Sequence, residues 1–235
     1  MQDSYRSTAW LRILAVLSLI LAGGLDRQAV ADPQPQPKEA VQSDQPEQSP
    51  AENPRKRALF SRAVKEVRSA MADRDLPGAR RKLKTVTANV QNDADQAQAE
   101  RLQVMQENLE EFWKGIRGAV ARLQPTEEID LHDNRVAVIA ASRDELMVQV
   151  YGQPQRYRVE AMPVKLLGAI VDRSFSPTGG SKVIVGTFLA VDREASNRAQ
   201  ARKLFQEAAK QGEPMGKQLL PELDVPIPES SPKRR

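Results

Sequence analysis

The stretch LQVMQENLEEFWKGIRGAVARL, residues 102–123, decides the fold. Its apolar side chains recur at steps of three or four residues: Leu102, Met105, Leu109, Phe112, Ile116, Val120 and Leu123. This spacing is close to the heptad seam of packed helices, so it predicts a long helix over 95–123. Such a helix is too short for a free coiled coil, and we expect it to pack against the helices that precede it. Trp113 lies beside the seam and is expected to pack in the core.

Two shorter helices are predicted before the seam, within residues 55–92. The first carries one apolar face, made of Phe60, Ala63, Val64, Val67, Ala70 and Met71. The motif DRDLPG, residues 73–78, interrupts this pattern, because proline and glycine favour turns. A second apolar stripe follows at Ala79, Leu83, Val86 and Val90. Residues 55–124 are therefore expected to form a helical domain that starts with a hairpin.

The period of the apolar residues changes to alternation within residues 125–162. The alternating residues are Ile129, Leu131, Val136, Val138, Leu146, Val148, Val150, Tyr157 and Val159. Turn-forming residues separate them at 132–134, 142–144 and 152–154. The pattern predicts three or four short antiparallel strands with one packed and one exposed face. Two arrangements remain open: a helix covers the packed face, or the sheet curls into a small barrel.

Helices are predicted again over residues 163–222. Pro163 suits the first position of a helix, which the loop SPTGGS at 176–181 ends. Residues 182–191 contain β-branched residues that suit a strand, but their apolar side chains share one helical face, so a helix is predicted. The last helix covers 196–212, with Ser196 as its cap and Gly212 at its end.

The predicted fold class is α+β and mainly helical. It consists of a helical hairpin plus a long helix, a small antiparallel β segment, and then C-terminal helices. Two stretches at the ends have a different composition: residues 32–54 include six prolines and residues 223–235 include three more. Segments so poor in large apolar residues do not bury enough surface to offset the entropy of ordering. We expect a disordered linker and a disordered tail.

Residues 1–31 have the parts of a secretory signal peptide in the usual order. A basic start precedes an apolar run at 13–22, and the small residues Ala29 and Ala31 occupy positions −3 and −1 of a cut before Asp32. The run is shorter than the roughly 20 residues that cross a bilayer, which favours cleavage over an uncleaved membrane anchor. The protein is therefore expected to be exported, to the periplasm or beyond, with a mature chain that begins at Asp32.

Composition limits the chemistry further. The chain has no cysteine, so disulfides, thiolate metal sites and cysteine nucleophiles are excluded. The net charge is +4, and residues 1–31 contribute three arginines and two aspartates, which leaves +3 for the mature chain. Nucleic-acid binding usually needs a stronger basic stripe, so no nucleic-acid partner is expected.

No catalytic, cofactor or metal site is predicted, and no cofactor is expected. His132 is the single histidine and falls in a predicted turn. Glu110 and Glu111 diverge by about 100° on a helix, so they do not flank one substrate, and the adjacent Glu127–Glu128 pair is likewise interpreted as solvated charge. SPTGGSK at 176–182 lacks the full spacing of a phosphate-binding loop.

Two further features bear on binding. ARRKLK, residues 79–84, is basic at helical spacing and is expected on the wet face of the second helix, with an anionic partner as the alternative. Aromatic residues that stack on sugars are scarce, and the candidates are Tyr151, Tyr157 and Trp113. This scarcity argues against a dedicated sugar-binding module.

Two stretches resemble tetratricopeptide-type helical hairpins: AVKEVRSAMADRDLPGARRKLKTV at 63–86 and GTFLAVDREASNRAQARKLFQEAAKQG at 186–212. The repeat of about 34 residues does not recur between them, because a β segment intervenes. The order of helix pair, β segment, FLAVD and helix over most of residues 105–222 also resembles uncharacterised exported proteins of planctomycete-type bacteria. The resemblance implies export and this layout, and it implies no activity or site residue.

These observations lead to one main hypothesis and two alternatives. The main hypothesis is an exported, non-enzymatic scaffold that binds another envelope or secreted protein, because helical hairpins present grooves to peptides and partner helices. Membrane contact is expected only transiently, through the signal segment. The first alternative is an envelope-surface protein that binds anionic polymer through 79–84 and the tail SPKRR at 231–235. The second is an enzyme of unfamiliar type that uses carboxylate or Ser/Lys chemistry near the β segment.

Overall fold

The structure, a computed structural model, describes residues 53–131 and 134–228. Several sequence predictions fall outside the described residues: the signal peptide with Ala29, Ala31 and Asp32, the 32–54 linker up to residue 52, His132, and the tail from residue 229 onward. Within the described part of the chain, no helix is both long enough and apolar enough to cross a bilayer.

The first two helices, α1 (Pro54–Ala72) and α2 (Leu76–Ala88), form the predicted hairpin. The Asn53 side chain caps α1, and the Asp75 side chain caps α2 by accepting a hydrogen bond from the Gly78 amide at 2.9 Å. The predicted turn between the two helices, residues 73–78, extends three residues too far, because α2 begins at Leu76. Residues 76–78 already form the first turn of α2, where a proline is well tolerated because the first amides of a helix need no partner within it.

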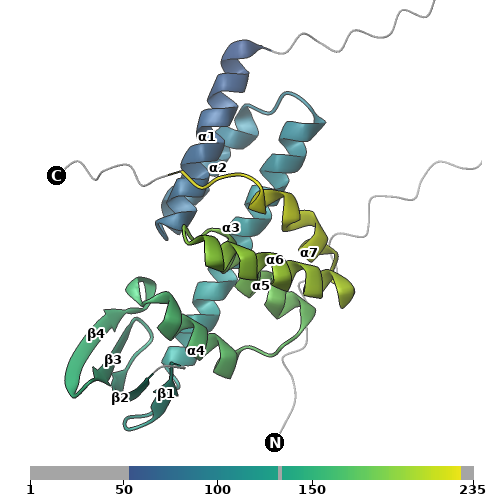
Figure 1. Cartoon of the computed structure of the whole chain (residues 1–235). Helices are drawn as coiled ribbons and strands as arrows, with labels where there is room; N and C mark the ends of the chain where they lie inside the picture. The colour runs from purple at the N-terminus through teal and green to yellow at the C-terminus, as the bar shows by residue number, and fades with distance from the viewer. Residues whose placement is uncertain (1–52, 132–133, 229–235) are drawn as a thin grey trace, which may run out of the picture. The chain divides into compact units, whose positions relative to one another are not determined.

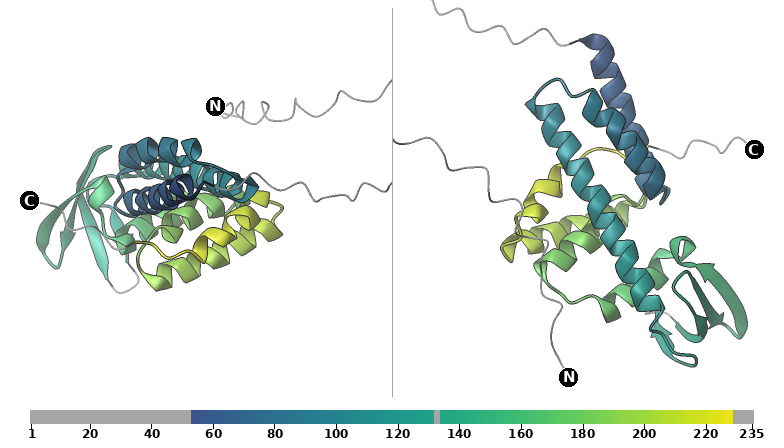
Figure 2. Two further views of the ribbon diagram at one scale, coloured as in Figure 1. Left: turned by 90° about the horizontal axis from the view of Figure 1, so that it is seen from above. Right: turned by 180° about the vertical axis from the view of Figure 1, so that it is seen from behind.

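The helix α3 (Asp93–Val120) is the centre of the fold. It contacts α1 and α2 as predicted, and also α4, α5 and α7. Figure 2 shows it running from the hairpin to the sheet. The seam residues within the helix are all buried: Leu102, Met105, Leu109, Phe112, Ile116 and Val120. The long helix predicted from this stretch is confirmed, and its seam is buried. The apolar stripe is wide enough for helices from both halves of the chain to pack against it.

The predicted β segment is a four-stranded antiparallel sheet in the order β1-β2-β3-β4. Its strands are β1 (Glu128–Asp130), β2 (Arg135–Ala141), β3 (Glu145–Val150) and β4 (Gln153–Arg158). Val136 pairs with Ile129, and Val148 pairs with Val138, so the apolar side chains share one face. The sheet is open, and α4 (Val164–Ser174) lies against β1, as Figure 1 shows. The sequence left two arrangements undecided, a covering helix or a small barrel. The barrel is wrong, because the sheet does not close.

The last hairpin of the sheet differs from its predicted boundaries. The turn is Tyr151–Gly152, and both residues have positive φ, at 49° and 80°. Such a pair matches the twist of antiparallel strands, so the chain can reverse within two residues instead of over 152–154. Pro154 consequently lies in β4, an edge strand, where a missing amide is tolerated. Val159 is buried, but it belongs to a 3₁₀ turn, η1 (Val159–Ala161), and not to a strand.

The C-terminal half is helical, as predicted. Beyond α4 it contains α5 (Gly179–Ala190), α6 (Ala195–Lys210), α7 (Pro214–Leu219) and the 3₁₀ turn η2 (Leu220–Leu223). The helix predicted for 182–191 is confirmed. Its packing requires Gly186, because a Cβ there would lie 2.7 Å from a ring carbon of Phe205 on α6.

Three details of this half correct the sequence predictions. The loop predicted at 176–181 ends at Thr178, whose side chain caps α5 through the Ser181 amide at 3.3 Å. Ser196 does not cap α6, because that helix already begins at Ala195. Residues 223–228 of the predicted tail are ordered into the fold: Leu223 is buried and belongs to η2. Gly212 has φ +84° and ends α6, as expected for a glycine past a helix end.

Candidate functional site

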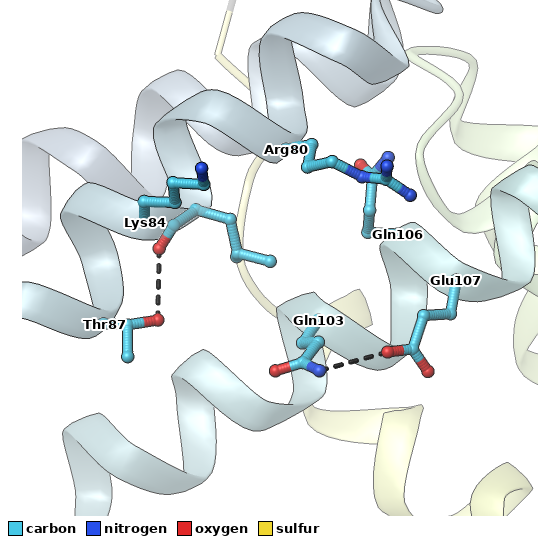
Figure 3. Close-up of a pocket in the computed structure, with 7 residues that line it drawn as sticks. Arg80, Lys84, Thr87, Gln103, Gln106 and Glu107 are labelled. Carbon is cyan, nitrogen blue, oxygen red and sulfur yellow. Dashed lines mark hydrogen bonds between the residues drawn. The ribbon is translucent and has the colours of Figure 1, made fainter.

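An open groove of about 240 Å³ runs between α2 and α3, and Figure 3 shows its lining. Four lining residues come from α2, namely Arg80, Leu83, Lys84 and Thr87, and three come from α3, namely Gln103, Gln106 and Glu107. Both sets recur at helical spacing, so each occupies one face of its helix. The groove thus combines an apolar floor at Leu83 with a rim that is cationic on α2 and polar or anionic on α3.

The polar side chains of the α3 rim are held by one another and by α2. Gln103 donates to Glu107 at 3.1 Å, as Figure 3 shows. Gln106 is buried and donates to the Leu76 carbonyl at 3.1 Å and to Glu110 at 3.0 Å. Glu110 also accepts from Arg80, at 2.7 Å. This network fixes the spacing of the two helices and therefore the width of the groove.

The α1–α2 hairpin concentrates positive charge. Residues 53–88 contain eleven lysines and arginines and three acidic residues, a net charge of +8, whereas the whole chain carries +4. The remainder of the chain therefore carries −4. This asymmetry is a property of one helical hairpin, and the mild charge of the complete sequence conceals it.

Part of this charge is paired within the hairpin. Glu66 on α1 accepts from Lys82 on α2 at 3.0 Å and from Arg62 at 2.9 Å. These hydrogen bonds, that of Lys82 first and that of Arg62 second, lower the pKa of Glu66 below its ordinary value. Arg81 and Lys84 are exposed and form no ion pair with any described residue. Lys84, which lines the groove, is thus available to an external carboxylate, whereas Arg80 already binds Glu110.

Glu110 and Glu111 diverge, as predicted, and the members of the Glu127–Glu128 pair also bind different partners. Glu110 binds Arg80, whereas Glu111 faces Lys114 at 3.2 Å. Glu127 pairs with Arg173 on α4, and Glu128 pairs with Arg135 at 3.5 Å. Neither adjacent pair flanks a common cleft.

A recess of about 600 Å³ beside β1 and α4 gathers three carboxylates, which belong to Glu128, Asp130 and Asp172. Two of them lie within 4.0 Å of Arg135. The described residues that line the recess include no serine or lysine. No group of three potential metal ligands of the His, Cys, Asp or Glu types is placed to hold an ion, in the part of the chain that is described.

The aromatic candidates are separated in the structure. Trp113 is 2% exposed and packs edge-on against Phe112 and Phe188, which confirms its expected place in the core. The Arg74 guanidinium covers its ring at 5.4 Å. Tyr151 is 85% exposed at the tip of the β3–β4 hairpin. The three aromatic candidates therefore do not build one sugar-stacking surface.

The sequence predicts the basic face of 79–84 as the wet face of a helix, but it predicts no groove. The polar counterpart on α3 is not predictable, because no local pattern joins residues 80 and 106. The loop at 176–182 proves to be a helix start in which Lys182 binds Glu207 at 2.8 Å.

No family model, curated protein or solved structure matches this chain. Its function must therefore be inferred from its own residues.

Proposed function

We propose that the protein is an exported, non-enzymatic binding module that docks an acidic segment of a partner protein on the α1–α2 hairpin. The observation that carries the proposal is the net charge of +8 on residues 53–88. Lys84 lines the groove, Arg81 is an exposed residue of the same helix, and neither forms an ion pair with a described residue. The expected partner is another envelope or secreted protein.

The groove suits a helical or extended peptide. An amphipathic segment can lay its apolar side on Leu83 and place its carboxylates against Arg80 and Lys84. Each exposed ion pair contributes about 0.2–1 kcal/mol, so the affinity depends on several pairs together. Such contacts also accelerate association, and salt screens them over about 10 Å at 0.1 M ionic strength.

The test compares three forms of the full chain. The first is wild type, the second is Arg81→Glu/Lys84→Glu, and the third is Lys203→Glu/Lys217→Glu, which makes the same charge change on α6 and α7. Each is immobilised and exposed to envelope extract at increasing salt. We expect wild type and the α6–α7 variant to retain the same protein, and the groove variant to lose it. Equal retention by all three forms would contradict the proposal.

A second candidate function is binding of an anionic polymer at the envelope surface, and the charge of the hairpin favours it too. Polymer binding depends on the summed positive field rather than on the shape of one groove. A fourth form, Arg55→Glu/Lys56→Glu, makes a matched charge change on α1, away from the groove lining. Polymer binding would then weaken to a similar extent in this form and in Arg81→Glu/Lys84→Glu, whereas docking in the groove would weaken mainly in the latter.

A further inference from the structure

The end of the described chain is held by arginines from three helices. We call residues 220–228 the C-terminal strap, and Figure 1 shows it running from α7 toward α1. Arg68 on α1 donates to the side chain and the carbonyl of Glu222, and Arg101 on α3 donates to the same carboxylate at 2.7 Å. Arg198 on α6 donates to the carbonyls of residues 223 and 225, at 2.5 and 2.8 Å. The strap is therefore packed against the helices and held in place by hydrogen bonds.

The positive charge at this place exceeds the negative charge. The guanidinium groups of Arg68 and Arg101 bind one buried carboxylate, that of Glu222, and Arg198 binds backbone carbonyls of the strap. Burial lowers the pKa of Arg68; Glu222 opposes this shift, and the positive charges of Arg198 and Arg101 add to it. The Nε atoms of Arg68 and Arg198 are buried and donate to no described residue. The site therefore has a surplus of cationic donors.

A cavity of about 390 Å³ opens between α1 and the strap, next to Arg68. Phe60 and Val64 line it from α1, and Val225 and Ile227 line it from the strap. Lys65 stands at its edge, exposed and without an ion pair to any described residue. Ligand pockets commonly have about 300–1,000 Å³, mostly apolar walls and a few converging polar groups, and this cavity has all three properties.

We propose that this cavity binds an amphiphilic monocarboxylate. The alkyl chain lies between Phe60, Val64 and the strap, and the carboxylate lies beside Lys65 in the positive potential of Arg68. Charge complementarity selects an anion, since the nearest carboxylate, Glu222, is already shared by two arginines. The apolar walls favour a ligand with a hydrocarbon chain, which an inorganic anion lacks. This site is distinct from the α2–α3 groove.

Sodium decanoate, kept below its micelle concentration, is the probe, and calorimetry on the full chain is the measurement. We expect saturable binding at one site. Decanol, which lacks the charge, and acetate, which lacks the tail, should each bind at least about tenfold more weakly. Equal binding of decanol, absence of saturable binding, or binding seen only with phosphatidylglycerol vesicles would overturn the proposal.

Two variants locate the site. Ser61→Trp places a large side chain from α1 into the cavity without removing core atoms, and Lys65→Glu reverses the charge at its edge. Both residues are exposed on α1, so both variants should keep the thermal transition of wild type. Each should weaken decanoate binding by about tenfold or more, whereas Lys84→Glu, the same charge reversal on α2, should leave it unchanged. Decanoate binding that survives in Ser61→Trp, or that falls equally in Lys84→Glu, would overturn the assignment.

Discussion

The buried ion pair between Arg68 and Glu222 should be the most sensitive polar contact in the fold. The two side chains are 5% and 1% exposed, and they join α1 to the strap across 154 residues of sequence. Glu222→Gln keeps the shape of the side chain and removes its charge, so Arg68 would remain buried beside Arg101 with no counter-charge. Breaking a buried pair in this way costs about 3–5 kcal/mol.

The assay is reversible unfolding of the full chain by heat and by denaturant. For a chain of this size about 1 kcal/mol shifts the melting temperature by about 2–4 °C, so a decrease of about 10 °C is expected. Glu111→Gln is the matched control, because its pair with Lys114 is exposed and contributes about 0.2–1 kcal/mol. The double variant Arg68→Met/Glu222→Leu should recover part of the loss, since it removes the buried Arg68 charge and leaves only Arg101, which is 26% exposed, without its partner. A Glu222→Gln protein within about 1 kcal/mol of wild type would refute this reasoning.

Two further predictions concern pH and packing. Burial is the largest single influence on the pKa of Glu160 and raises it, but the hydrogen bond from Arg117, a backbone hydrogen bond and the charges of Arg117 and Arg158 together outweigh burial. The net pKa therefore lies below the ordinary 4.5. Its contribution to stability is therefore present above pH 4.5 and is lost as the pH falls, so Glu160→Gln should flatten the acid limb of stability measured by denaturant titration. Gly186→Ala should destabilise the fold by about 1–3 kcal/mol, because its Cβ meets the Phe205 ring. Gly168→Ala, with open space around it, should instead stabilise by about 0.5–1 kcal/mol, and thermal melts compare the two.

The parts of the fold that local periodicity determines were predictable. The seam at 102–123 and the alternation at 125–162 indicate a helix and strands, because burial on one face imposes those periods. Helix starts were less predictable: Thr178 caps α5 and Glu194 precedes α6, and the sequence offers several similar candidates nearby. Caps are decided by which amides remain unpaired in the folded chain.

Long-range features could not be predicted from a single sequence. Glu222 is the last residue of the region predicted to be helical, directly before the predicted tail, and its burial depends on Arg68 and Arg101, which are more than 100 residues away. The groove shows the same limitation, because its two rims belong to different helices. The basic rim at Arg80 and Lys84 follows from sequence spacing, but its juxtaposition with Gln106 depends on tertiary packing.

Site-specific photocrosslinking tests the central proposal most directly. A photoreactive amino acid replaces Thr87, at the edge of the α2–α3 groove, or Lys203, on the exposed face of α6, in the full chain. The account predicts a specific adduct from position 87, through an acidic segment of one partner protein, that disappears with Arg81→Glu/Lys84→Glu. It predicts no such adduct from position 203. Equal adducts from both positions, or an adduct at position 87 that persists in the double variant, would contradict it.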